Sequence, residues 1–145
     1  MLDVQGALRE VRAQLVAVNH HVSQRLGLRD GDLECLDLVS RHGPVSPSAL
    51  AKLAGLHPAT MTGVLDRLER AGWVGRERDQ RDRRAVVVRV RPERGGEVFR
   101  HYGAMRAYVD DICADYDHQQ LTMIAEFVRR VADAGERASA ELARE

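Results

Sequence analysis

Apolar side chains recur every three or four residues through most of this chain, the spacing that places them on one face of a helix. The first such stripe predicts a helix that closes at Gly27, and its members are Leu8, Val11, Leu15, Val18, Val22 and Leu26. A second helix is expected after residues 30–32, where the carboxylates of Asp30 and Asp32 are placed to cap it. The His42-Gly43-Pro44 break ends that helix.

Two short helices joined by a tight turn are predicted next. Ser46 caps the first, because its hydroxyl accepts a free backbone N–H, and Pro47 suits the first helical position because no donor is lost there. Gly55 can take the left-handed conformation that ends this helix, and Pro58 starts the next one. The apolar positions of the next helix are Met61, Val64, Leu65 and Leu68. If these four face the core, the outward residues are Ala59, Thr60, Thr62, Gly63, Asp66 and Arg67.

Alternation replaces the helical spacing after Gly72. Trp73 and Val74 begin one predicted strand, and residues 85–91 alternate in a second. The loop between the strands, residues 79–83, is highly charged and has no glycine, which favours an exposed, flexible wing over a tight two-residue turn.

Helical spacing returns after Pro92, which ends the second strand and opens a long predicted helix running to Tyr116. Asp117 interrupts it and forms, with Gln120, a predicted capping box for a last helix that continues as a polar tail over 134–145. The expected fold class is mainly α with a small β-hairpin wing. We expect one domain over 1–145, with a winged helix-turn-helix at about 31–91 flanked by helices at about 1–27 and 92–145.

Composition narrows the class of protein. A chain of 145 residues with 44% hydrophobic residues suffices for one packed domain. Cys35 and Cys113 form no CxxC pair, so neither a disulfide framework nor a zinc ribbon is predicted, and a reducing cytoplasm is the expected location. No membrane partner is expected, since the sequence has no long apolar run or signal-peptide pattern. The sequence also has no GxSxG, P-loop or HExxH motif, so no enzyme and no cofactor are predicted.

Charge is distributed unevenly along the chain. The net charge is +0, but residues 66–94 contain ten arginines and six acidic residues. A basic segment of this kind, with acidic flanks, is what a protein with one DNA-facing surface has. The zero net charge also supports the alternative of a winged-helix protein-interaction module that does not bind DNA.

The predicted helix-turn-helix suggests how DNA would be contacted. In this geometry the second helix enters the major groove. Thr60 and Thr62 are then placed to touch base edges or phosphates, and Arg67 to reach phosphate or guanine, unless Asp66 or Glu69 pairs with it. Arginines of the wing suit the negative potential of a minor groove. Phosphate contact at the helix start by Ser46 is a secondary possibility.

From Leu50 to Arg84 the sequence closely resembles the MarR family of bacterial regulators. The family pattern of "Leu-Glu-x-x-Gly", a short strand and an Asp-x-Arg wing is matched at Leu68, Glu69, Gly72, Asp82 and Arg84. The resemblance implies that the helices at about 1–27 and 92–145 are dimerisation helices, which gives a homodimer on a pseudo-palindromic site in double-stranded DNA. It also implies that Arg84 enters the minor groove, with Asp82 steering the wing through a salt bridge. The full set of expected DNA-binding residues is Ser46, Ala59, Thr60, Thr62, Gly63, Arg67, Arg76, Arg81, Asp82, Arg83 and Arg84.

Two departures from the family pattern accompany the match. Gly63 stands where members often carry a basic or larger polar residue, and residues 90–95 replace the usual "Leu-Thr-x-x-Gly". In this family small aromatic effectors lie near the dimer interface, which implies His21, Arg25 and Tyr108 as candidate ligand contacts. A plain interface role is the alternative for these three residues.

The cysteines and histidines suggest no further chemistry. Cys35 lies in an apolar run with no basic neighbour, which predicts a packed structural thiol, and Cys113 lies among aspartates. Adjacent His20 and His21 point to different helix faces, and no His-x3-His pair joins them, so no metal site is predicted.

Overall fold

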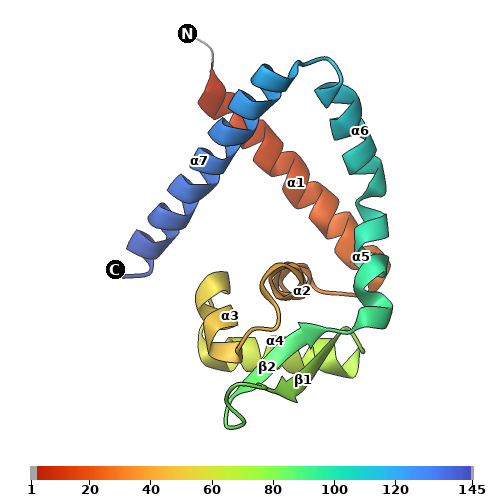
Figure 1. The fold of residues 1–145 in the computed structure, drawn as a ribbon, viewed down its shortest axis with the longest axis vertical. Helices are drawn as coiled ribbons and strands as arrows, with labels where there is room; N and C mark the ends of the chain where they lie inside the picture. Colours follow the sequence, from red (N-terminus) through yellow and green to blue (C-terminus); the bar gives the residue numbers. More distant parts are fainter. Residues whose placement is uncertain (1–2, 145) are drawn as a thin grey trace. The chain divides into compact units, whose positions relative to one another are not determined.

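The fold was obtained as a computed structural model, which describes residues 3–144. Contacts divide the chain into two compact units, one ending at His101 and the other beginning at Tyr102. The first unit holds the predicted winged helix-turn-helix, and the second consists of two helices (Figure 1). No described helix is long and apolar enough to cross a membrane.

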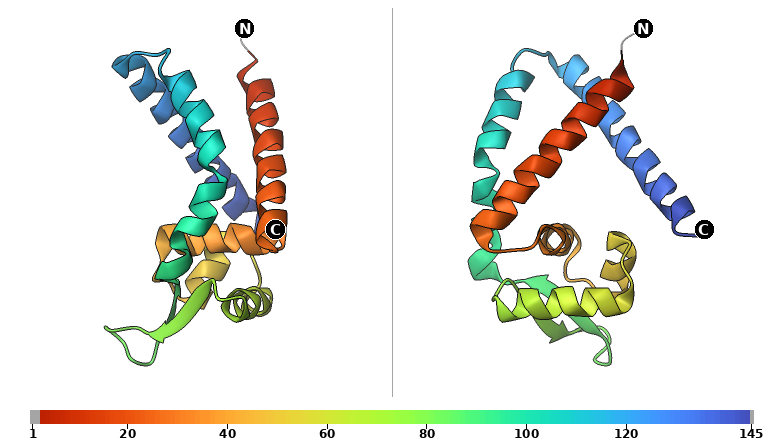
Figure 2. Two further views of the ribbon diagram at one scale, coloured as in Figure 1. Left: turned by 90° about the vertical axis from the view of Figure 1, so that its right-hand side faces the viewer. Right: turned by 180° about the vertical axis from the view of Figure 1, so that it is seen from behind.

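Helices of the first unit follow the predicted order. They are α1 (Val4–Leu26), α2 (Asp30–His42), α3 (Pro47–Ala54), α4 (Pro58–Arg70) and α5 (Gly95–His101). Gly27 and Gly55 end α1 and α3 with positive φ values of 68° and 66°, as the sequence predicts. Figure 2 shows α4 running across α2, with α3 beside one end of α4, and α2 contacts α1, α3 and α4.

A two-stranded antiparallel sheet completes this unit. Strand β1 (Val74–Arg78) pairs with β2 (Val86–Val90) in the register Val74 to Val90, and residues 79–85 form the wing loop at the end of the hairpin (Figure 1). Val45, between α2 and α3, forms a bridge with Val88. Through this bridge the hairpin is hydrogen-bonded to the helical body as well as packed on it.

One hydrophobic core lies between α2, α3, α4 and the hairpin. Its largest members are fully buried, and all four apolar positions predicted to face inward from α4 belong to it. Cys35 packs in the same core at 2% exposure, which confirms the predicted buried thiol. Burial and the nearby carboxylates of Asp32 and Glu34 raise the pKa of Cys35 to about 11, so this thiol stays protonated at neutral pH.

The second unit contains α6 (Gly103–Cys113) and α7 (His118–Leu142). Asp117 accepts the Gln120 N–H at 2.9 Å, and the Gln120 side chain accepts the Asp117 N–H at 2.9 Å, so the predicted capping box is confirmed. Neither described helix of this unit contains a buried residue.

Two predictions of local structure are wrong. Asp30 and Asp32 do not cap α2, whose N-cap is Arg29 without a side-chain hydrogen bond, because both carboxylates bind side chains elsewhere. The long helix expected from Pro92 is instead the 3₁₀ turn η1 (Pro92–Arg94), α5 and α6, with a break at Tyr102. Apolar spacing continues through the break and so gives no sign of it.

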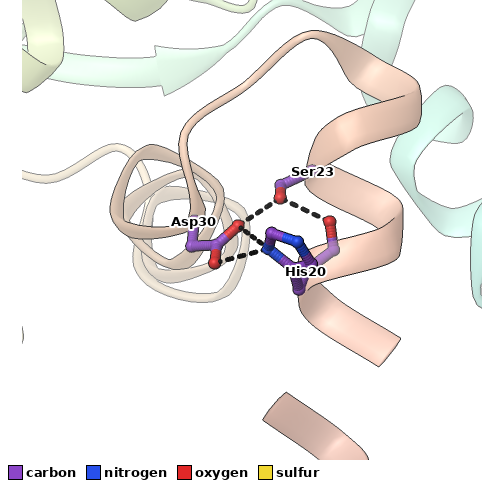
Figure 3. A network of polar contacts seen from close by, with 3 residues as sticks. All are labelled: His20, Ser23 and Asp30. Atoms are coloured by element: carbon purple, nitrogen blue, oxygen red, sulfur yellow. Dashed lines mark hydrogen bonds and ion pairs between the residues drawn. The ribbon is translucent and has the colours of Figure 1, made fainter. Parts of the chain in front are cut away.

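A network of polar contacts joins α1 to α2. The Asp30 carboxylate lies 2.9 Å from Nδ1 of His20 and accepts the hydroxyl of Ser23, which also lies 2.8 Å from the carbonyl oxygen of His20 (Figure 3). Hydrogen bonds from Ser23 and then His20 lower the pKa of Asp30 below its ordinary value of 3.8. The short α1–α2 connection is therefore held by side chains as well as by the Gly27 turn.

Candidate nucleic-acid interface

Helix α4 presents one buried and one outward face. His57 caps its start, because Nδ1 accepts the Ala59 N–H at 3.2 Å, and Pro58 occupies the first helical position. Thr60 and Thr62 are exposed on the face opposite the core, as predicted. The Thr62 hydroxyl donates to the Pro58 carbonyl at 3.0 Å, whereas no described hydrogen bond involves the Thr60 hydroxyl.

The preceding helix supports this face. Ser46 accepts the Ala49 N–H at 3.2 Å with Pro47 at the first helical position, which confirms the predicted cap. Gly55 then reverses the chain so that α3 packs against α4, with Leu50 fully buried between them and the core. The two helices form the compact pair that the sequence predicts, and the start of α4 is exposed.

Arg67 of α4 forms an ion pair that the sequence analysis missed. Its Nε and Nη2 donate to the two carboxylate oxygens of Asp32 at 2.8 and 3.0 Å. The Asp32 side chain is only 5% exposed and that of Arg67 is 35% exposed. These hydrogen bonds raise the pKa of Arg67 above its ordinary value. The pair ties α4 to the start of α2, and it replaces the predicted alternatives of Asp66 and Glu69.

Arg76 of β1 is also paired. Its guanidinium lies 2.9 Å from Asp66 and 3.4 Å from Glu69, both on α4. Strand β1 is thus joined to α4 by charge as well as by packing. Sequence reasoning gave Asp66 and Glu69 as possible partners of Arg67. In the structure both carboxylates form ion pairs with Arg76 instead.

The wing loop is organised by backbone contacts. Asp79 and Asp82 each accept a backbone N–H two residues later, from Arg81 and Arg84, at 3.0 Å. Among the described residues Asp82 forms no ion pair, so the salt bridge predicted for it is not found; its carboxylate accepts the Arg84 backbone N–H and orders the turn.

Three arginines of the wing have no ion-pair partner among the described residues. These are Arg81, Arg83 and Arg84, and all three are exposed. Arg89 on β2 differs, since it pairs with Glu77 at 3.0 Å. The wing tip therefore concentrates unpaired positive charge on a short, ordered loop.

The candidate ligand residues lie in both units. His21 and Arg25 are exposed and lie one turn apart on α1, and Tyr108 is 68% exposed on α6. His21 contacts the ring of His20, with centroids 5.9 Å apart. The ligand role of the three residues stays a prediction.

Sequence reasoning missed three contacts: the ion pair of Asp32 with Arg67, the helix cap supplied by His57, and the hydrogen bond from Arg94 to the Ala71 carbonyl. His57 had a local signal, since His57-Pro58 repeats the arrangement of Ser46-Pro47, a capping side chain before proline. The partner of Asp32 is 35 residues away in sequence and that of Arg94 is 23 residues away, so local sequence patterns do not predict either contact.

The MarR family model matches residues 28–86, which cover α2, α3, α4 and most of the hairpin. Among similar proteins, the HTH-type transcriptional regulator YcgE of Bacillus subtilis is 32% identical over 125 residues, covering 86% of this chain and 81% of that protein. The HTH-type transcriptional repressor YetL of the same organism is 26% identical over 140 residues, covering 95% and 82%.

Solved structures agree on the fold. RV1404 from Mycobacterium tuberculosis superposes with a TM-score of 0.68 at 24% identity, covering 93% of this chain and 94% of that one. The family match falls on the helix-turn-helix described above, and the similarity to YcgE covers most of both chains. The chain therefore belongs to the MarR family of helix-turn-helix transcriptional regulators.

Proposed function

We propose that this chain represses transcription as a homodimer that binds a pseudo-palindromic operator in double-stranded DNA and releases it in response to a small ligand. The observation that carries the proposal is the trio of unpaired arginines at the wing tip, in the same unit as the exposed threonine face of α4. We place its action in the cytoplasm, and we propose that it acts by binding, without a catalytic step or a cofactor.

Within this proposal the outward face of α4 contacts the major groove. Thr60, whose hydroxyl is uncommitted, contacts bases, and Thr62 offers its methyl group, since its hydroxyl bonds within the helix. Ala59 and Gly63 allow close approach of the duplex, and Ser46 lies at a helix start suited to phosphate. Arg67 contributes through Nη1, because its other nitrogens bind Asp32.

The wing contacts the adjacent minor groove. Arg84 enters the groove while Arg81 and Arg83 flank it on phosphates, and Asp82 shapes the turn that carries them. Arg76 acts indirectly in this arrangement, by holding β1 on α4. Together with the α4 contacts this gives each protomer one major-groove and one minor-groove anchor.

Homodimerisation is supported by the exposed apolar side chains of the second unit. No residue of the described α6 or α7 is buried, yet their surfaces carry Val109, Ile112, Met123, Ile124, Phe127 and Val128. Exposed apolar side chains gathered on one helix pair are typical of a surface that binds another protein. A second copy of the chain is the partner that a two-fold operator requires.

Ligand response is proposed from three exposed side chains of α1 and α6. His21 and Arg25, one turn apart on α1, offer an imidazole and a cation that suit a small aromatic acid, and Tyr108 of α6 is a separate candidate contact through its phenol. The name of the relative YetL supports repression as the direction of control. An effector acts here only through different affinities for two arrangements of the protein.

Fluorescence anisotropy on a duplex selected by the wild-type chain from a random library tests the proposal. Arg84→Ala should weaken binding about tenfold on every sequence and lower the salt slope by about one unit, because it removes one positive charge from the minor groove. Arg9→Ala removes the same charge from exposed α1 and serves as the control. Equal effects of the two variants would remove the wing from the mechanism.

Thr60→Ala should change base preference more than overall affinity. Selection repeated with this variant measures the change directly. If wild-type protein binds no duplex and flows through heparin at low salt, the protein-interaction module favoured by the zero net charge replaces the present proposal.

A further inference from the structure

Arg94 lies in η1, between strand β2 and helix α5, within residues 90–95, which depart from the family pattern. Its Nη1 donates to the carbonyl oxygen of Ala71 at 2.6 Å, and its guanidinium carbon lies 3.5 Å from the ring centroid of Trp73. Its Nε and Nη2 contact the Glu97 carboxylate at 3.1 and 3.4 Å. One side chain thus contacts the end of α4, the residue before β1, and α5.

The contact with Ala71 completes the C-terminus of α4. Gly72, at φ 81°, allows two hydrogen bonds back into the last turn, from its own N–H to Glu69 and from the Trp73 N–H to Leu68. These two bonds are the Schellman pattern that satisfies helix carbonyls. The Ala71 carbonyl lies beyond them and accepts Arg94. A cation at this position is also favoured by the helix dipole.

Arg94 also stacks on Trp73, so its role extends beyond capping α4. Trp73 is the only tryptophan of the chain and is 1% exposed. Its carbonyl accepts the Arg91 N–H at 2.9 Å, so the turn that carries Arg94 is hydrogen-bonded to the same residue. A guanidinium stacked on an indole gains cation–π energy and excludes water from the ring. Movement of α5 relative to α4 breaks this stacking.

Glu97 holds the opposite edge of the guanidinium from α5. The hydrogen bond from Arg94 lowers the pKa of Glu97, and the charges of Arg94, Arg100 and His101 act in the same direction. The planar fork of arginine supplies one edge to Glu97 while its remaining nitrogen reaches Ala71. Lysine keeps the charge but cannot bridge both sites in this geometry.

We propose that Arg94 is a positioning residue for DNA recognition, because it fixes the end of α4 and the start of β1 against α5 at one angle. The outward face of α4 and the wing both extend from the Ala71 to Trp73 turn, so a small rotation there displaces both anchors. Specific contacts need placement to within about 0.5 Å, whereas attraction to phosphates does not. The inference rests on the proposed DNA-binding function.

The test compares Arg94→Lys, Arg94→Gln and the control Arg100→Gln, which removes a charge from an exposed position of α5. Each variant is titrated with the selected duplex and with a scrambled duplex of equal length, at two salt concentrations. Both Arg94 variants should lose about tenfold on the selected duplex, while Arg94→Lys stays within about twofold of wild type on the scrambled one, with the same salt slope. Arg100→Gln should keep the wild-type ratio of the two affinities.

Trp73 emission provides a readout independent of DNA. It should change in both Arg94 variants and stay at the wild-type value in Arg100→Gln. Glu97→Gln keeps the Ala71 and Trp73 contacts and loses only the ion pair with α5, so it should lower the affinity ratio by less, and it serves if the Arg94 variants fail to fold.

Two results would overturn the inference. One is an affinity ratio for Arg94→Lys equal to that of the wild type, which would leave the residue as a charge only. The other is an equal loss on both duplexes, which would indicate simple destabilisation. If wild-type protein bound neither duplex, the proposed function itself would fail, and the positioning role with it.

Discussion

The winged body, which consists of α2, α3, α4 and the hairpin, and the helix pair α6 and α7 bury their apolar residues to very different extents. Around α4 the core is closed, with Leu50, Leu65 and Leu68 fully buried. In α7 the apolar side chains are exposed instead, to 70% at Met123 and 46% at Phe127. Both regions have regular amphipathic helices, so secondary structure alone does not distinguish them.

This difference in burial indicates which part of the chain can fold stably by itself. Burial of apolar area is the main favourable term in folding, and a helix pair without buried side chains lacks it. The winged body has its own core, whereas no described residue of α6 or α7 is buried, and in the proposed homodimer a second copy of the chain covers their apolar side chains.

The largest effect is expected in the winged core. Leu65→Ala leaves a cavity beneath α4 and should lower the free energy of unfolding by about 2–5 kcal/mol. Met123→Ala removes a side chain of similar size from exposed α7, in the other unit, and should change the free energy of unfolding of the winged body by less than about 0.5 kcal/mol. Urea unfolding followed by Trp73 fluorescence measures both values. Similar losses would mean that the two regions share one core.

Phe127→Asp should act on association instead of folding. A carboxylate among the exposed apolar side chains of α7 is expected to weaken the proposed dimer by about 2 kcal/mol or more, which raises its dissociation constant roughly thirtyfold. Sedimentation equilibrium should detect monomers at micromolar concentration, with Trp73 emission unchanged. Arg129→Ala on the same helix is the control. A wild-type protein that sediments as a monomer would contradict the dimer.

Two helix caps give a matched comparison. Ser46→Ala and Asp117→Ala each remove a hydrogen bond to a backbone N–H, worth about 1 kcal/mol of helix stability. The Ser46 change should lower the unfolding free energy reported by Trp73. The Asp117 change should lower dimer affinity and helix content without altering that signal. Equal shifts at Trp73 would show that the chain unfolds as one cooperative unit.

The smallest effect is a pH dependence of the winged unit. The pKa of Glu97 is below its ordinary value of 4.5 because Arg94 donates to it. Its contribution to stability is complete above pH 4.5 and is lost as the pH falls below that value toward the folded-state pKa. Acid titrations of wild type and Glu97→Gln measure the difference. The variant should lose less stability over this range, and parallel curves would contradict the interaction.

The helix-turn-helix was predictable because its signals are local. Capping residues before proline, glycines at helix ends and apolar spacing act within a few residues, and the predicted inward face of α4 is confirmed residue by residue. The break between α5 and α6 was not predictable in this way. Gly103 begins α6 without a capping side chain, and the apolar stripe runs on across the interruption.

The candidate site was predictable in its outline but not in its pairings. Exposure of Thr60, Thr62 and the wing arginines follows from which positions the core occupies. The partners of Arg67 and Arg76 do not follow from it, because Asp32 and Asp66 reach them through tertiary packing. The charge distribution over residues 66–94 therefore indicates a basic segment, while the fold decides which of its arginines remain unpaired.

Gly63 has a consequence for how this surface can change. A methyl group at Gly63 would lie 3.5 Å from Nη1 of Arg67, an ordinary contact, so the fold accommodates alanine there. Glycine within a helix costs about 1 kcal/mol relative to alanine. Gly63→Ala should therefore stabilise the protein while covering bare backbone in the middle of the outward face of α4. If this face contacts the major groove as proposed, a side chain at position 63 should alter base preference without a loss of stability, which repeated selection with the variant would measure.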